Sequence, residues 1–289
     1  MYYDKNTTIY LNGQWLKAED ATTGLYQQSF HYGNGVFEGI RSYKTKDGAK
    51  VLKAREHFER LLFSADKMYI DLKYSVDELM VICNELLEKN NMQDAYIRPL
   101  VYTDENMGLQ PESKANLFMC AWEWGKYYDK AVKVMTSPFR RPDPKSCYVE
   151  VKVTGHYTNS LIAIKDAKQK GFDEALLLDN HGFVAEATGA NFFYQKDNKL
   201  FTAPRGNILP GITRSLIMDL AKENGIVVEE KHFTPQDVYN SDGAFFTGTA
   251  VEVNPIESLD DQPFKKDWRE TFGHELHQQF NNYARCNVL

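Results

Sequence analysis

Two turns rich in glycine and hydroxyl side chains could bind an anion. The first, Asn207–Arg214 (NILPGITR), runs directly into an amphipathic helical pattern, and Thr213 is a reasonable N-cap for that helix. Backbone amides at a helix start, together with a hydroxyl, favour a phosphate. The second turn, Phe246–Ala250 (FTGTA), lies between two strand-like runs and could offer hydroxyls and amides to the same anion. Each turn taken alone is more typical of ordinary structure.

Lys152 and Glu186 could carry acid–base or covalent chemistry, but their local patterns do not single them out. Lys152 lies in a run where valines alternate with polar residues, as on a half-buried strand, Tyr148–Thr154 (YVEVKVT). Lysines on strands are usually solvated. Glu186, in Phe183–Asn191 (FVAEATGAN), has the same ordinary interpretation when it is considered alone.

Other familiar catalytic signatures are absent from the sequence. There is no GxxxxGK[ST], GxGxxG, GxSxG or HExxH, and the near match His274–His277 (HELH) has its histidines three apart. Without a third ligand it is more typical of an exposed helix face than of catalytic zinc. The cysteines form no CxxC pair, so we expect reduced thiols rather than a zinc ribbon or a redox dithiol. They are Cys83, Cys120, Cys147 and Cys286.

The composition of the 289 residues is that of an ordinary globular protein. A formal net charge of -6 argues against nucleic acid or an anionic membrane as the main partner, because phosphate backbones require concentrated Lys and Arg. No run approaches the roughly 18 to 20 apolar residues of a membrane helix, and the N-terminal residues lack a signal-peptide pattern. The sequence therefore predicts a cytoplasmic protein.

Local patterns predict an α+β fold with a small N-terminal domain. Asn12-Gly13 favours a hairpin turn, and apolar spacing predicts a helix from about Glu56 to Tyr69. Ser75 and Glu78 form a capping box at the start of a second helix. We place the small α/β domain at residues 1–122.

The remainder of the chain is expected to form a larger, β-rich domain. Residues 123–131 have no clean period and are the best linker candidate, which leaves 132–289 as the second domain. Strands dominate there, and neither half shows the regular strand–helix alternation of a doubly wound sheet. The expected strands include Val132–Ser137, Tyr148–Val153 and Glu174–Leu178, and helices are expected at Leu161–Lys168, Arg214–Asn224 and Trp268–Tyr283.

These pieces, in this order, resemble the branched-chain aminotransferase branch of the fold-type-IV, class-IV enzymes that depend on pyridoxal 5'-phosphate (PLP). The resemblance covers nearly the whole chain, which is far more specific than any one motif. Its motifs are His31–Gly33 leading to Val36–Arg41, Arg55–His57 with Arg60–Leu61, Ala95–Pro99, Asn106–Leu109, Lys152–Tyr157, Glu186–Asn191, Leu209–Arg214 and Gly248–Ala250.

The resemblance implies a D-amino-acid-aminotransferase-like fold with a pseudo-barrel C-terminal domain, and it assigns roles around PLP. Lys152 would be the catalytic residue that forms the Schiff base and then moves the proton. Because a free lysine titrates near pH ~10.4, it must be imine-bound or desolvated to act as nucleophile and base. Glu186 would pair with the pyridine nitrogen, and Tyr157 would bind the O3′ oxygen. Arg55, Ile212, Thr213 and Thr249 would form the phosphate cradle.

The resemblance also implies a substrate site that is completed by a second subunit. Tyr96 with the amides of Thr249 and Ala250 would bind the substrate carboxylate, with Arg98 beside them. An apolar wall would face an aliphatic side chain, with Tyr32 and Leu109 reaching over from a partner subunit, which requires a homodimer or an oligomer built from dimers. The wall residues are Phe37, Tyr32, Trp124, Tyr127 and Leu109.

The implied reaction transfers amino groups between branched-chain L-amino acids (Leu, Ile, Val) and 2-oxoglutarate. Ala190, Val153, Thr154 and His156 depart from the family pattern beside the cofactor and the lysine, which leaves the substrate range open. Related enzymes of the same fold act on D-amino acids or amines, or are aminodeoxychorismate lyases. A non-catalytic protein that merely binds PLP or another phosphate is a further alternative, in which Lys152 would be dispensable.

Overall fold

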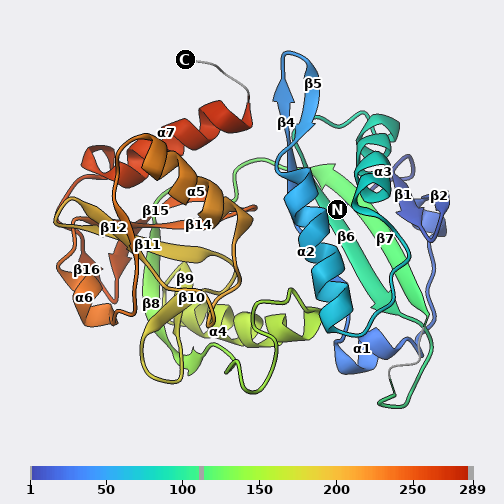
Figure 1. Ribbon diagram of the computed structural model, residues 1–289, viewed down its shortest axis with the longest axis horizontal. Coiled ribbons are helices and arrows are strands. Elements are labelled where there is room, and N and C mark those ends of the chain that lie inside the picture. Colours follow the sequence, from blue (N-terminus) through green and yellow to red (C-terminus); the bar gives the residue numbers. More distant parts are fainter. Residues whose placement is uncertain (1, 111–113, 286–289) are drawn as a thin grey trace. The chain divides into compact units, whose positions relative to one another are not determined.

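The computed structural model describes residues 2–110 and 114–285, which fall into two compact units (Figure 1). Unit 1 comprises Met1–Gly125 together with Val151–His156, and unit 2 comprises Lys126–Glu150 together with Tyr157–Leu289. Each unit has its own sheet and its own hydrophobic core. The first crossing between the units, after Gly125, falls inside the predicted linker 123–131.

Unit 1 is built on an antiparallel sheet in the order β2-β1-β7-β6-β4-β5, with β3 beside β6. Ile97 and Val101 of β6 and Met119 of β7 are fully buried against α2 and α3. The elements are β1 (Thr8–Leu11), β2 (Gln14–Lys17), α1 (Gln28–Tyr32), β3 (Val36–Phe37), β4 (Ile40–Thr45), β5 (Gly48–Val51), α2 (Ala54–Lys67), α3 (Val76–Lys89), β6 (Ala95–Thr103) and β7 (Ala115–Glu123).

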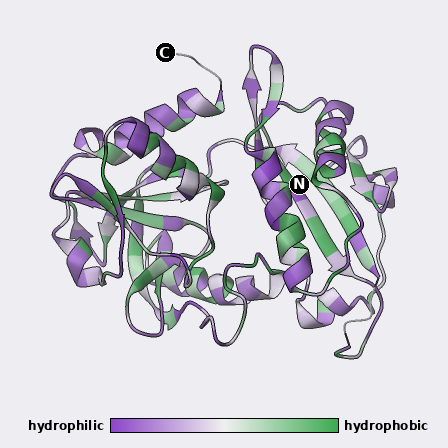
Figure 2. Cartoon of the chain, viewed as in Figure 1, coloured by the Kyte–Doolittle hydropathy of each residue, from purple (hydrophilic) through white to green (hydrophobic). Residues whose placement is uncertain are grey.

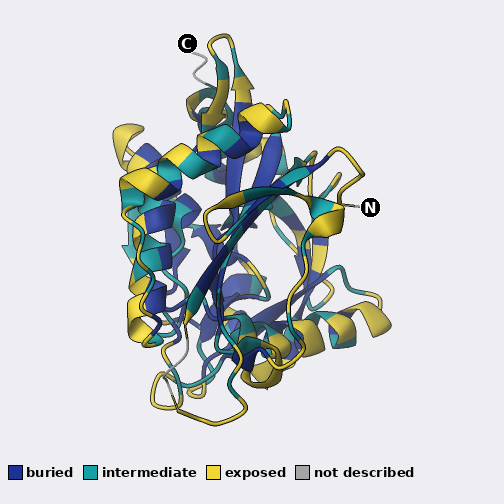
Figure 3. Ribbon diagram, turned by 90° about the vertical axis from the view of Figure 1, so that its right-hand side faces the viewer, coloured by how far each residue is buried: buried dark blue, intermediate teal, exposed yellow. Residues whose placement is uncertain are grey.

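Local signals in unit 1 have their expected outcomes. Asn12 and Gly13 adopt positive φ angles of 50° and 87° in the β1–β2 turn, which confirms the hairpin. The capping box of α3 is present, since Ser75 Oγ accepts from the Glu78 amide while Glu78 accepts from the Ser75 amide. Helix α2 begins two residues before the predicted Glu56, and its apolar face is buried, as Figure 3 shows for the inner sides of the helices.

Unit 2 contains a sheet that closes on itself. The pairing order β10-β9-β8-β15-β14-β11 returns to β10 through the β10–β11 pair, so these strands form the predicted barrel-like ring. Phe192, Phe246 and Phe233 lie in its core, and apolar residues line these strands (Figure 2). The strands are β8 (Val132–Arg140), β9 (Glu174–Leu178), β10 (Val184–Ala187), β11 (Asn191–Lys196), β12 (Lys199–Thr202), β13 (Val228–Glu230), β14 (Gly243–Gly248), β15 (Glu252–Leu259) and β16 (Gln262–Pro263).

The helices of unit 2 pack on this sheet near their predicted positions. Helix α4 lies against β8 and β9, and α5 and α7 lie against β14. Their bounds are α4 (Tyr157–Gln169), α5 (Ile212–Glu223), α6 (Pro235–Tyr239) and α7 (Phe272–Ala284).

The segment around Lys152 differs from its prediction. Residues Tyr148–Val153 do not form a strand of either sheet, apart from an isolated bridge between Val36 and Val153. Val151 and Val153 are each 3% exposed and belong to the core of unit 1. The alternating pattern was therefore real, but it marks a short extended segment, and Val151 and Val153 lie in the core of unit 1. The prediction of one continuous second domain at 132–289 did not include this crossing.

Three further features concern metal-binding groups, helix length and the cysteines. Within the described residues no group of His, Cys, Asp or Glu could hold a metal ion, and no described helix is long and apolar enough to cross a bilayer. Cys83, Cys120 and Cys147 form no disulfide, and Cys286 lies outside the described residues. Burial raises the pKa of the Cys83 and Cys120 thiols to about 12.

Candidate functional site

The backbone of Lys152 is held on both sides by unit 1. Its carbonyl accepts a hydrogen bond from the Phe37 amide (3.1 Å), and its own amide donates to Ser64 Oγ on α2 (3.3 Å). These contacts, with the buried valines on either side, fix where the lysine side chain starts.

The residues that follow the lysine are held by a close backbone approach. The Gly155 amide donates to the Gly33 carbonyl (2.8 Å), and Thr154 Oγ1 donates to the same oxygen (2.9 Å). A Cβ on Gly155 would lie 2.8 Å from that oxygen, and Gly33 has a φ of 65°. Glycine is therefore required at both positions.

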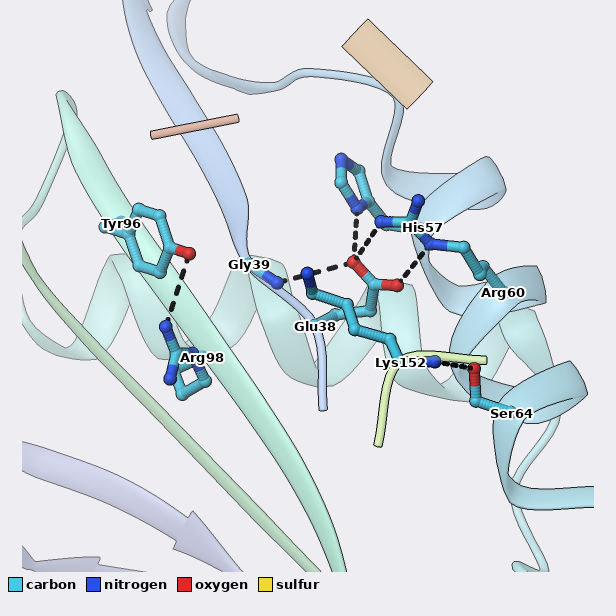
Figure 4. Close-up of polar contacts among 8 residues, drawn as sticks. All are labelled: Glu38, Gly39, His57, Arg60, Ser64, Tyr96, Arg98 and Lys152. Atoms are coloured by element: carbon cyan, nitrogen blue, oxygen red, sulfur yellow. Dashed lines mark hydrogen bonds and ion pairs between the residues drawn. The ribbon is translucent and has the colours of Figure 1, made fainter. Parts of the chain in front are cut away.

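The Lys152 side chain extends toward the carboxylate of Glu38 (Figure 4). Its Nζ atom lies 4.9 Å from the centre of the Phe37 ring. Glu38 is completely buried, and Phe37 is 8% exposed. The half-buried Lys152 thus places its amine against an aromatic ring.

Glu38 accepts hydrogen bonds from two side chains of α2. Arg60 donates from Nε to Oε1 (2.6 Å) and from Nη2 to Oε2 (2.9 Å), and His57 Nδ1 lies 2.8 Å from Oε2. Burial alone would raise the pKa of Glu38, but the Arg60 charge and these hydrogen bonds more than offset it and hold that pKa below its usual range. Burial lowers the pKa of His57, which Glu38 only partly opposes. The cluster therefore contains an ionised Glu38 and a neutral His57.

Arg55, the arginine predicted for the phosphate cradle, lies on the opposite side of α2. Arg55 and Ser64 are about two and a half helical turns apart, so they point in opposite directions, whereas His57 and Arg60 share the Ser64 side. The Arg55 side chain is 53% exposed and its Nη2 lies 2.6 Å from Asp77 Oδ1. The structure does not bring Arg55 to the Lys152 group; Arg60 is the arginine of α2 that lies there.

The predicted substrate residues of unit 1 form an aromatic group around Arg98. The Arg98 guanidinium lies 4.7 Å from the Phe37 ring centre, and its Nη2 donates to the Tyr96 hydroxyl (3.3 Å). The Tyr96 ring lies 5.1 Å from the Trp124 ring. Trp122, which was not predicted from the sequence, stacks on Tyr96 at 5.0 Å. Its position two residues before Trp124 on an alternating run was the available signal.

Three other predicted wall residues have the following contacts and exposures. Tyr32 donates from its hydroxyl to the Met107 carbonyl (2.8 Å) and is 45% exposed, while Leu109 is 83% exposed. Tyr127 belongs to unit 2, where its ring contacts Tyr128 edge to face at 4.7 Å.

In unit 2, Glu186 is held by a set of donors at the end of β10. Asn191 Nδ2 donates to Oε2 (2.9 Å), the Leu209 amide lies 3.2 Å from both oxygens, and Arg141 Nε lies 2.6 Å from Oε1. Glu186 and Arg141 are both buried. Arg141 is close enough to Glu186 to form an ion pair, but its Nε–H does not point at the carboxylate and forms no hydrogen bond. Arg141 was not predicted, because no sequence motif distinguishes it from Arg140.

The predicted phosphate turn is the start of α5. Its N-cap is Gly211 rather than the predicted Thr213, which lies inside the first turn and is buried. A Cβ on Gly211 would overlap Asn191 Oδ1, so only glycine fits. No side chain caps the helix start, which contains Ile212 and Thr213. Amides and a hydroxyl presented in this way fit the phosphate of PLP.

The remaining predicted residues of unit 2 follow β14 or begin α4. Thr249 and Ala250 form the turn between β14 and β15. A Cβ on Gly248 would lie 3.4 Å from the Gly189 carbonyl, so this turn packs on the loop that follows Glu186. Tyr157 is the half-buried first residue of α4.

Comparison with known proteins identifies the family of the chain. The family model described as amino-transferase class IV matches residues 35–259. The branched-chain-amino-acid aminotransferase of Pseudomonas aeruginosa is 40% identical over 264 residues, covering 89% of this chain and 86% of the relative. The enzyme of that name from Escherichia coli K12 is 38% identical over 261 residues, covering 87% and 84%.

Solved structures give the same result. The branched-chain amino acid aminotransferase of Escherichia coli has a TM-score of 0.94 at 34% identity, covering 99% of this chain and 97% of that one. The T.th. branched-chain amino acid aminotransferase complexed with N-(5'-phosphopyridoxyl)-L-glutamate has a TM-score of 0.94 at 32% identity, covering 98% and 96%. With a family match over most of its length and relatives of this similarity, the chain belongs to the class IV aminotransferases.

Proposed function

We propose that the protein is a branched-chain-amino-acid aminotransferase, which transfers the amino group of Leu, Ile or Val to 2-oxoglutarate and yields branched 2-oxo acids and L-glutamate. The observation that carries the proposal is the half-buried Lys152, whose amine a class IV chain holds against the Phe37 ring. The names of the relatives support the substrate class. The phosphopyridoxyl-glutamate complex of a similar enzyme supports PLP as cofactor and glutamate as product.

PLP, when bound, supplies an electron sink for the carbanion at the substrate α-carbon. Lys152 would hold the cofactor through Nζ and, once displaced by the substrate amine, would carry the proton to and from the α-carbon. Glu186 would accept a hydrogen bond from the pyridine nitrogen, with Arg141 and Asn191 holding the carboxylate in place. Tyr157 would donate to the O3′ oxygen.

The phosphate would be bound by the start of α5 and by an arginine. The amides of Ile212 and Thr213 and the hydroxyl groups of Thr213 and Thr249 remain the proposed cradle. We assign the arginine of this cradle to Arg60 instead of Arg55, because Arg60 lies on the side of α2 that faces the Lys152 segment.

The substrate would be oriented by polar groups and enclosed by aromatic rings. Tyr96, with Arg98 beside it, and the amides of Thr249 and Ala250 would bind the carboxylate. Phe37 and Trp124 would contact the aliphatic side chain; Phe37 is buried against Arg98, and the half-buried Trp124 packs against Tyr96.

A homodimer would supply the rest of the wall. Tyr32 in α1 and Leu109 are exposed in unit 1, and so are apolar side chains of α1, of the segment before it and of the segment after β6, namely Phe30, Tyr26 and Met107. Such a patch is larger than isolated surface residues and is typical of an interface. Light scattering at low protein concentration would give a dimer mass, and a monomer mass would contradict the proposal. A cytoplasmic location stays a prediction.

The proposed function can be tested by locating the cofactor and by assaying the substrates. Purified protein with PLP should be yellow, and borohydride should fix the label on Lys152 in peptide mass maps. Lys152→Ala should abolish glutamate formation from L-leucine and 2-oxoglutarate, whereas Lys165→Ala, at an exposed position of α4, should retain it. Label on another lysine, or transfer from D-alanine but not from L-leucine, would contradict the proposal.

A further inference from the structure

Glu38 is the one acidic side chain in the group around Lys152 drawn in Figure 4, and it has no access to solvent. We propose that Glu38 is a positioning residue: it fixes the Arg60 guanidinium in the orientation that binds the cofactor phosphate. The inference rests on the proposed function and extends it, because Glu38 itself would touch neither phosphate nor substrate.

The contact between Glu38 and Arg60 determines the orientation of the guanidinium and not only its position. Two parallel hydrogen bonds, Nε to Oε1 (2.6 Å) and Nη2 to Oε2 (2.9 Å), fix the guanidinium plane as well as the guanidinium carbon. A single contact would leave the plane able to rotate. An arginine oriented in this way before the anion arrives loses little further side-chain freedom on binding.

Glu38 can serve as this anchor because its own carboxylate is fixed from other directions. His57 donates from Nδ1 to Oε2 (2.8 Å), and the Gly39 amide lies 3.3 Å from the same atom. His57 is 3% exposed and comes from the same helix as Arg60. The carboxylate therefore connects α2 to the strand segment after β3, and it cannot follow Arg60 if the guanidinium swings away.

Glu38 also supplies the counter-charge of Arg60. Without a counter-charge, Arg60 would be an uncompensated cation in a buried region before any phosphate is bound, which is costly. Glu38 compensates the Arg60 charge in the cofactor-free protein, while the lysine amine lies against the Phe37 ring.

The test compares two ligands that differ only in the phosphate. The affinity of the cofactor-free protein for PLP and for pyridoxal is measured by absorbance of the lysine adduct, for the parent protein and for Glu38→Gln. We expect Glu38→Gln to reduce the preference for PLP over pyridoxal by about ten-fold or more, as loss of an oriented charge-assisted contact would. The affinity for pyridoxal should change much less, whereas a general loss of structure would weaken both ligands alike.

Two further variants complete the design. Glu38→Asp keeps the charge with a shorter reach and should retain part of the preference for PLP, which also covers the case in which Glu38→Gln fails to fold. Asp77→Asn removes the carboxylate partner of Arg55 on the same helix and should leave the preference unchanged.

The possible outcomes separate the inference from the proposed function. An unchanged preference for PLP over pyridoxal in Glu38→Gln would overturn the positioning role. A larger preference would overturn it too, because it would mean that Glu38 competes with the phosphate for Arg60. If the parent protein formed no adduct with PLP at Lys152, the proposed function itself would fail, and the inference with it.

Discussion

Two arginines of helix α2 each form an ion pair with a carboxylate. The two pairs have the same shortest distance, but one is buried and the other is exposed. Arg60 lies 2.6 Å from Glu38, with side-chain exposures of 11% and 0%, and Arg55 lies 2.6 Å from Asp77, with exposures of 53% and 78%. An exposed pair contributes little because water screens it. In a buried pair each charge depends on the other, so removal of one leaves the other uncompensated. Distance alone therefore does not identify which arginine matters.

The largest expected effect comes from breaking the buried pair. Arg60→Met should lower the free energy of unfolding by about 3–5 kcal/mol, because Glu38 would remain buried without its cation. The same variant should lose most of its affinity for PLP. Denaturant unfolding of the cofactor-free protein measures the first quantity. A loss below about 1 kcal/mol would place the pair in the same class as an exposed pair.

An intermediate effect, which depends on pH, is expected from His57, the histidine that contacts Glu38 of the buried pair. The pKa of His57 is lowered in the folded protein, so below about pH 6.5 the unfolded chain takes up a proton that the folded protein does not. Stability should therefore fall on acidification, by up to about 1.4 kcal/mol per pH unit for this one proton. Since the pKa of Glu38 is also lowered from its ordinary value near 4.5, its contribution is lost only at lower pH.

His57→Gln should remove this acid sensitivity between about pH 6.5 and 5. The slope of unfolding free energy against pH should be shallower in the variant than in the parent protein over that window, whatever constant offset the substitution adds. His232→Gln, at an exposed position, serves as the matched control and should keep the parent slope. Equal slopes in all three proteins would show that His57 does not titrate differently on folding.

The smallest effect is expected from the exposed pair. Arg55→Met should change the free energy of unfolding by less than about 1 kcal/mol, because both charges stay solvated when separated. Its affinity for PLP should match that of the parent protein. A large loss of affinity for PLP in this variant would indicate that Arg55 binds the phosphate after all. The buried and the exposed pair would then not differ in their effect on cofactor binding.

Much of the fold could be predicted because its signals are local. The hairpin at Asn12-Gly13 follows from the positive φ that these residues tolerate, and the α3 capping box needs only Ser75 and Glu78, three positions apart. The prediction of Thr213 as the N-cap of α5 was wrong. Gly211, two residues earlier, is the last residue with an extended conformation, and the helix begins directly after it. In that case two nearby residues were both acceptable caps.

The sequence by itself determined the family, through ordered motifs that include Lys152, Glu186 and the turn before α5. Only the tertiary structure decided that the Lys152 segment belongs to unit 1, that Arg60 rather than Arg55 lies on the side of α2 that faces it, and that Arg141 accompanies Glu186. Spacing along a helix or strand shows which residues share a face. The packing of the core decides which of these faces meets a segment far away in the sequence. The spacing of residues in one sequence does not carry that information.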